Sequence, residues 1–192
     1  MKDEDPIRAF FAIDLDDAAR EAVCDVLHVL RESPGSEGVR WVRREAFHVT
    51  LRFLGSIDPE QVVALAHAVG AEVAGQVPFA MTLGAVRLFP SPRRPRVVAL
   101  EMAPEAELFE LAAAVERGTG ACGFEPEDRR FRAHLTLGRI KKGKGPATQG
   151  LCVPDGTATP VEDVVLFRSE LQRSGAKYSP LERMALGGNV HP

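Results

Sequence analysis

A chain of 192 residues is long enough for one domain, or for two lobes that share a core. Its net charge of −3 argues against binding of a long polyanion through overall charge, although binding through a local basic patch remains an alternative. Three scattered cysteines favour neither a disulfide framework nor a zinc site. The acidic start does not resemble a signal peptide and no apolar run is long enough for a membrane span, so we expect a cytoplasmic protein.

Hydrophobic periodicity predicts an alternation of strands and helices along the chain. In the first half we expect a strand at 8–15, a helix at 16–32, one or two strands within 39–55, and a helix at 56–75. In the rest of the chain we expect strands at 78–90 and 96–102, a helix at 104–123, and strands at 131–140, 161–171 and 178–186. Asp16 or Asp17 is a candidate cap of the first helix, and Asp58, followed by Pro59, of the second.

The tetrapeptide His-x-Thr-Leu occurs twice, beginning at His48 and at His134. With five His and seven Thr in the chain, chance predicts about 0.18 His-x-Thr pairs. Both copies lie in expected strands, and each belongs to its own half, which suggests an internal duplication. Strict alternation predicts that two polar sets share a face, His48, Thr50 and Arg52 in one strand and His134, Thr136 and Gly138 in the other. It places Phe47, Val49, Leu51, Phe53, Ala133, Leu135 and Leu137 on the opposite faces.

Two such pairs that face each other would form an acid–base site. A neutral imidazole takes a proton from a nucleophile, an imidazolium gives one to a leaving group, and threonine hydroxyls donate to an oxyanion. A phosphodiester suits this layout because its transition state gathers negative charge on the non-bridging oxygens. A metal site is the weaker interpretation, since both motif strands lack carboxylates.

The segments around both motifs, HVTLRFLG and FRAHLTLGRI, resemble the paired signatures of the two-histidine phosphoesterases. More narrowly, the chain resembles the RNA 2′,3′-cyclic phosphodiesterases, also named the 2′-5′ RNA ligase family. The likeness includes the opening RAFFAIDLDDAAREAV, the approach WVRREAF and the closing VVLFRSELQRSGAKYSPLERMAL, so it spans nearly the whole chain in order.

This resemblance implies an α+β fold, a single bilobal domain over residues 1–192. It would have two pseudo-symmetric lobes of antiparallel sheet with outer helices and an active-site cleft between them. It implies metal-independent hydrolysis of a terminal 2′,3′-cyclic phosphate on RNA to a 2′-phosphate without a cofactor, and 2′-5′ ligation as the reverse use of the site. By family analogy His48 is the acid, His134 the base, and Thr50 and Thr136 hold the phosphate.

The family pattern also makes Phe53 and Arg139 substrate-binding residues that sandwich the terminal base, although strict alternation points both away from the histidines unless the strands bulge. Arg52 would lie near the phosphate if alternation holds. Basic loop residues either guide RNA to the cleft or are ordinary solvated loop charges, the usual role of such runs: Arg93, Arg94, Lys141, Lys142 and Lys144. A monomer is expected. A cyclic phosphodiesterase of small nucleotides and a non-catalytic nucleotide-binding module remain as alternatives.

Overall fold

The computed structural model describes residues 5–153, 157–172 and 175–187. The described chain contains three α-helices, which are α1 (Asp17–Glu32), α2 (Gln61–Val73) and α3 (Glu105–Ala121). Its first strands are β1 (Ile7–Asp14), β2 (Val39–Trp41), β3 (His48–Ile57), β4 (Phe79–Phe89) and β5 (Val97–Ala103). The later strands are β6 (His134–Ile140), β7 (Ala158–Val161), β8 (Asp163–Gln172) and β9 (Gly175–Ala185), and a short 3-10 turn spans Arg44–Ala46.

The predicted order of strands and helices is confirmed, with one strand added. Strand β7 was not predicted, because four residues that include Pro160 carry little strand signal. It pairs with β4 at the edge of the sheet, where a proline is tolerated since no further strand needs its missing N–H.

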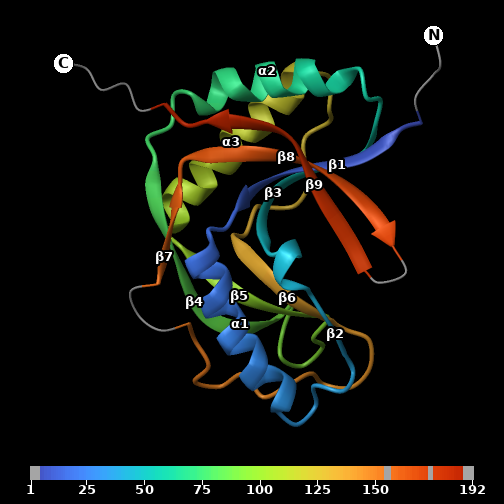
Figure 1. Cartoon of the computed structure of the whole chain (residues 1–192), viewed down its shortest axis with the longest axis vertical. Coiled ribbons are helices and arrows are strands. Elements are labelled where there is room, and N and C mark those ends of the chain that lie inside the picture. Colours follow the sequence, from blue (N-terminus) through green and yellow to red (C-terminus); the bar gives the residue numbers. More distant parts are fainter. Residues whose placement is uncertain (1–4, 154–156, 173–174, 188–192) are drawn as a thin grey trace.

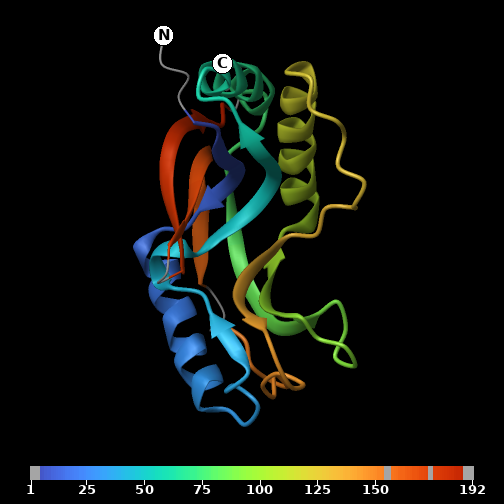
Figure 2. The same ribbon diagram turned by 90° about the vertical axis from the view of Figure 1, so that its right-hand side faces the viewer.

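The strands form one antiparallel sheet in the order β7-β4-β5-β6-β3-β1-β8-β9, with β2 paired to β6. Strands β3 and β6, which carry the two motifs, are joined in register only at Val49 and Leu135. From this narrow junction the sheet diverges into two groups of strands (Figures 1 and 2), which we call the β6 lobe (β2, β4, β5, β6, β7) and the β3 lobe (β1, β3, β8, β9).

The helices lie outside the sheet and bury their apolar stripes against it. In α1 the buried positions follow helical spacing, namely Ala19, Val23, Val26, Leu27 and Leu30. Helices α2 and α3 pack together at the top of Figure 1, over the β3 lobe, whereas α1 lies at the bottom. None of the helices in the described ranges has the length and hydropathy that a bilayer crossing requires.

The two predicted helix caps have different outcomes. Asp16 caps α1, since its carboxylate accepts a hydrogen bond from the Ala19 N–H at 2.7 Å. The cap predicted at Asp58 is wrong, because a turn closed by the Gln61 N–H on the Asp58 carbonyl delays the start of α2. The Gln61 side chain instead accepts from the Asp58 N–H at 3.0 Å, and Pro59 lies in that turn.

An internal repeat underlies the fold. In the first copy β1, α1 and β3 occur in this order, with β2 between α1 and β3, and β1 pairs antiparallel with β3. In the second copy β5, α3 and β6 occur in the same order, and β5 pairs antiparallel with β6. The first seven residues of β3 and of β6 also alternate between buried and accessible positions in the same pattern. The predicted pair of pseudo-symmetric lobes of antiparallel sheet with outer helices is therefore confirmed.

Candidate active site

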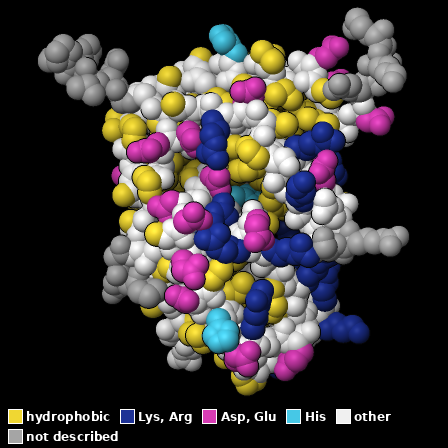
Figure 3. Space-filling model, viewed as in Figure 1, with side chains coloured by type: hydrophobic (Ala, Val, Ile, Leu, Met, Phe, Trp, Pro, Cys, Tyr) yellow, Lys and Arg dark blue, Asp and Glu magenta, His cyan; other side chains and the backbone are white. Residues whose placement is uncertain are grey.

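The sheet junction brings both His-x-Thr pairs together. Because Val49 and Leu135 are antiparallel partners, His48 comes next to Thr136 across the junction, and Thr50 comes next to His134. Val49 and Leu135 are fully buried toward the core, so the four polar side chains lie on the opposite face of the sheet and are half-buried there. We call this face, at the junction of the two lobes, the cleft. Figure 3 shows histidine in the middle of one face of the molecule, with Lys and Arg side chains near it.

Both imidazoles are held in the same way. The Nδ1 of His48 lies 2.9 Å from the carbonyl oxygen of Ala46, and the Nδ1 of His134 lies 2.8 Å from that of Arg132. A carbonyl only accepts hydrogen bonds, so each Nδ1 carries a proton and donates it. Each Nε2 is therefore the nitrogen that exchanges a proton, and that of His48 lies 3.0 Å from the hydroxyl oxygen of Thr50.

Aromatic side chains surround His48. Its ring lies 4.8 Å from that of Phe10 and meets Tyr178 edge-on at 5.0 Å, measured between centroids. These rings belong to a small apolar cluster on the cleft side of the β3 lobe, built on Phe10 and Phe167. Burial among them lowers the pKa of His48 to about 4, against the opposing effects of the Ala46 carbonyl and the Asp14 carboxylate. His48 is thus neutral at pH 7 in the free protein.

His134 has a different neighbourhood. Its ring lies 5.7 Å from that of Phe89, and the Arg132 guanidinium stacks on the Phe89 ring, 4.9 Å from the ring centroid. From there a groove of about 750 Å³ runs between the end of β5, the segment that precedes β6 and the start of α3. Its walls include Phe89, Glu101, Phe109 and Arg132, so aromatic faces and charges of both signs line it.

A β-bulge follows the threonine of each motif. Thr50 pairs with Ala12 and Arg52 with Phe11, which leaves Leu51 without a partner in β1. Thr136 pairs with Ala99 and Gly138 with Val98, which leaves Leu137 without a partner in β5. An extra residue in one strand reverses the face of every residue beyond it.

The bulges bring Phe53 and Arg139 to the face of the histidines, so the opposite placement that strict alternation predicted is wrong. Both residues stand five positions after the histidine of their motif. Phe53 is 60% exposed and its ring lies 5.8 Å from that of Phe10, at the edge of the apolar cluster. Arg139 is exposed on β6.

The same bulges overturn two other predictions. Arg52 does not face the phosphate site but is 7% exposed on the opposite face, where its Nη1 contacts both carboxylate oxygens of Glu116 at 2.6 and 2.5 Å. Gly138 is also buried on that face, and a Cβ there would lie 2.8 Å from the Trp41 ring. Arg52 and Gly138 occupy equivalent positions in the repeat, and both face the core side of the sheet rather than the cleft.

Each histidine has a carboxylate beside it that the motif strands did not reveal. Asp14 is the partner of His48 in β1, and Glu101 is the partner of His134 in β5. The predicted absence of carboxylates holds within the two motif strands, but the neighbouring strands supply one each. Only the pairing of strands distant in sequence shows this, so no local signal could have found it.

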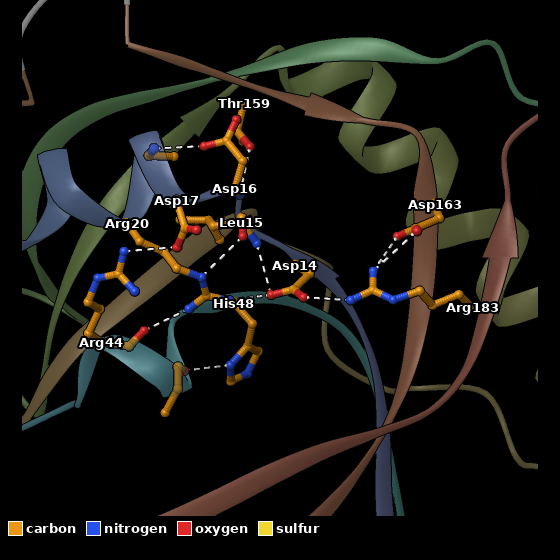
Figure 4. Close-up of polar contacts among 12 residues, drawn as sticks. Asp14, Leu15, Asp16, Asp17, Arg20, Arg44, His48, Thr159, Asp163 and Arg183 are labelled. Carbon is orange, nitrogen blue, oxygen red and sulfur yellow. Dashed lines mark hydrogen bonds and ion pairs between the residues drawn. The ribbon is translucent and has the colours of Figure 1, made fainter.

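Asp14 also anchors the turn that orients His48 (Figure 4). Its carboxylate pairs with Arg20 and, at 2.9 Å, with Arg183. Arg20 in turn donates to the Arg44 carbonyl at 2.7 Å, at the start of the turn whose Ala46 carbonyl holds the His48 ring. The predicted loop cations, Arg93, Arg94, Lys141, Lys142 and Lys144, are all exposed.

Within residues 5–153, 157–172 and 175–187, no three His, Cys, Asp or Glu side chains group closely enough to hold a metal ion. The immediate donors of the site are imidazole nitrogens and hydroxyl oxygens from the two motifs.

Comparison with known proteins agrees with this geometry. The family model described as LigT-like phosphoesterase matches the chain twice, over residues 13–99 and 100–178. A protein of Archaeoglobus fulgidus named RNA 2′,3′-cyclic phosphodiesterase is 39% identical over 136 residues, which cover 71% of this chain and 74% of that protein. A protein of the same name from Methanothermobacter thermautotrophicus is 31% identical over 184 residues, with 92% and 97% coverage.

Comparison of this fold with a solved structure gives the same result. The crystal structure of E. coli LigT in apo form superimposes with a TM-score of 0.79 at 30% identity, and the match covers 96% of this chain and 99% of that one. A family model that matches each half of the sequence also agrees with the internal repeat seen in the strands. The chain therefore belongs to the LigT-like phosphoesterase family.

Proposed function

We propose that this protein hydrolyses the 2′,3′-cyclic phosphate at the end of an RNA to a 2′-phosphate. The observation that carries the proposal is the junction at Val49 and Leu135, which sets each motif histidine beside the threonine of the other motif. A phosphate seated over this junction has an imidazole Nε2 toward either end and a hydroxyl beside each. The relatives' names support the choice of a cyclic phosphate on RNA.

The reaction follows from this placement. The Nε2 of His134 takes a proton from water as the water oxygen attacks phosphorus, and the protonated Nε2 of His48 gives a proton to the 3′ oxygen as its bond to phosphorus breaks. The hydroxyls of Thr50 and Thr136 donate to the non-bridging oxygens, where negative charge grows in the transition state. The products are a free 3′-hydroxyl and a 2′-phosphate.

His48 must be protonated to act as the acid, although its imidazole is neutral in the free protein. A phosphodiester anion placed against Nε2 favours the charged form and raises the pKa of His48 in the complex. The carboxylate of Asp14 acts in the same direction. Substrate binding therefore supplies the charge that the aromatic surroundings of the free site disfavour.

Two further features belong to the proposal. The histidines and threonines supply a base, an acid and oxyanion donors, which is sufficient for metal-independent hydrolysis. A 5′-hydroxyl of RNA in the position of the attacking water would give a 2′-5′ linkage through the same steps. Ligation is thus the same chemistry with another nucleophile.

Product analysis tests the proposal. We expect the protein, in EDTA, to convert a short RNA with a 2′,3′-cyclic end into one with a 2′-phosphate. His48→Ala and His134→Ala should each lower the rate by about 10² to 10⁴-fold, the usual contribution of one general acid or base. His67→Ala, on the outer helix α2, is the matched control and should retain full activity.

A 3′-phosphate product would contradict the assigned leaving group. Loss of all activity in EDTA with rescue by one divalent cation would contradict metal independence. Absence of any product would favour a small cyclic nucleotide as substrate or a binding function without catalysis, which direct nucleotide-binding measurements would separate.

A further inference from the structure

Two arginines face each other at one end of the cleft. Arg40 of β2 is the antiparallel partner of Arg139 of β6, and both are exposed. The bulge at Leu137 turns Arg139 to the side of the histidines, and paired residues in a sheet point to the same side. The neighbours of Arg40 confirm its direction, since Val39 and Trp41 pack over Gly138 on the core side.

This arrangement is electrostatically unfavourable without an anion. Like charges directly opposite each other destabilise a pair of strands. Within the described residues, neither Arg40 nor Arg139 forms an ion pair with a carboxylate, whereas Arg20, Arg52 and Arg183 do. The two guanidiniums are therefore free to share a ligand of opposite charge.

The pair also bridges the two lobes. The Nη2 of Arg40 lies 3.8 Å from the point that a Cβ on Gly175 of β9 would occupy. Arg139 acts on Tyr178 of the same strand, where its charge opposes the burial that raises the pKa of that phenol. Figure 1 shows the β8–β9 hairpin extending toward β2, so an anion here contacts the β6 lobe and the hairpin of the β3 lobe together.

The pair lies beside the reacting phosphate rather than on it. Arg139 stands three residues beyond Thr136, which is about 10 Å along a strand. Thr136 is the residue next to His48 across the junction, so the arginines lie at the end of the cleft where His48 protonates the 3′ oxygen. The ribose that carries this oxygen, and the chain attached to its 5′ carbon, lie toward the same end.

We propose that Arg40, together with the guanidinium edge of Arg139, binds the phosphodiester that joins the terminal nucleotide to the rest of the RNA, while the plane of Arg139 stacks on the terminal base as the family pattern implies. The protein then prefers oligonucleotide ends over nucleoside cyclic phosphates. This inference rests on the proposed function and identifies its substrate class. A guanidinium donates two parallel hydrogen bonds to phosphate oxygens, and the bound anion removes the repulsion between the two arginines.

The test compares three substrates that differ only on the 5′ side. They are a nucleoside 2′,3′-cyclic phosphate, the same nucleoside with a 5′-phosphate, and a dinucleotide that ends in the cyclic phosphate. We expect Arg40→Ala to lower kcat/KM for the dinucleotide about tenfold, the usual effect of one hydrogen bond to a charged group. Its kcat/KM for the nucleoside cyclic phosphate should stay at the wild-type value, which also shows that the variant folds.

Salt dependence provides a second readout. The decrease of kcat/KM for the dinucleotide with rising salt should become shallower in Arg40→Ala, since one attraction between opposite charges that salt screens is lost. Arg31→Ala is the matched control, because it removes the same charge from an exposed position on α1 and should change neither quantity.

Equal losses on all three substrates, or no loss on the dinucleotide, would overturn the inference. Arg40→Ala should also lower kcat/KM for the 5′-phosphorylated nucleoside, which carries the same phosphate. An unchanged value there, beside a loss on the dinucleotide, would overturn the assignment of this phosphate to Arg40. Binding of a dinucleotide with a 2′-phosphate is measured in parallel and needs no turnover. Weaker binding by Arg40→Ala than by Arg31→Ala supports the inference even if hydrolysis fails, whereas absent hydrolysis of all three substrates by the wild type contradicts the proposed function alone.

Discussion

The two motif histidines share one tautomer but not one environment. Phe10 and Tyr178 enclose His48, while His134 contacts Phe89, which lines an open groove. Desolvation penalises the charged form of an imidazole, so burial lowers the proton affinity of His48 below that of a free solvent-exposed histidine. A duplicated motif thus becomes functionally unequal through the residues around it.

This environment predicts a loss of stability in acid. The pKa of His48 is about 4 in the folded protein and 6.5 in a solvated chain, so between these values the unfolded state binds a proton that the folded state does not. Stability is fully present above pH 6.5 and falls as the pH drops toward 4, by up to about 3 kcal/mol. Denaturant unfolding at pH 7 and pH 4 measures this loss.

The comparison needs a variant without the imidazole. In His48→Ala the loss between pH 7 and pH 4 should be smaller by about the same 3 kcal/mol. His67→Ala serves as the matched control for removal of one histidine. An identical loss in the wild type and in His48→Ala would show that other groups cause the acid sensitivity.

At the scale of secondary structure, the sequence predicts the motif strands but not their bulges. His48 and Thr50 share a face because two residues make one period of a strand, and the same holds for His134 and Thr136. Beyond Thr50 and Thr136 the side chains no longer follow the predicted alternation between the two faces of the sheet. Arg52 turns inward to meet Glu116, a residue 64 positions away, and such a partner leaves no trace in the local pattern.

The bulges therefore decide which residues reach the cleft. The family resemblance indicated Phe53 and Arg139 where periodicity did not, and the structure supplies the physical reason. Arg40 illustrates the opposite case, because its position beside Arg139 depends on pairing between strands about 100 residues apart. Pairing of this kind can be read from the fold but not from the spacing of residues in one strand.

Alanine substitutions at two glycines in the last turns of α3 should have opposite effects on the stability of the protein. A Cβ on Gly118 would lie 2.6 Å from the Cα of Val69 in α2, whereas a Cβ on Gly120 would meet nothing within 4 Å. Gly118→Ala should destabilise the protein by about 1–3 kcal/mol, since backbone must move to admit the methyl group. Gly120→Ala should be neutral or stabilise by up to about 1 kcal/mol through helix propensity.

Urea midpoints of the two variants and the wild type measure this difference. Because both substitutions add the same methyl group to the same helix, propensity cancels in the comparison and the packing of α2 on α3 remains. Equal effects of the two substitutions would show that the helices can separate without cost.

At the scale of the whole molecule, neither half of the sequence contains a complete lobe. The β3 lobe combines β1 and β3 from the first half with β8 and β9 from the second. The β6 lobe combines β2 and β4 from the first half with β5, β6 and β7 from the second. The duplication is visible in the sequence, but this exchange of strands is not, because it depends on which edge each late strand joins.

The exchange predicts that the lobes unfold together, as one domain. Unfolding one lobe removes strands that are covalently continuous with the other and opens the single junction at Val49 and Leu135.

The chain carries one tryptophan and one tyrosine, Trp41 in the β6 lobe and Tyr178 in the β3 lobe, so each lobe has its own spectroscopic probe. Trp41 fluorescence and the tyrosine near-ultraviolet circular dichroism should give coincident denaturation midpoints, and far-ultraviolet circular dichroism should give the same value. Separate midpoints for Trp41 and Tyr178 would instead show that each lobe holds its strands without the other, and that the cleft joins two independently stable bodies.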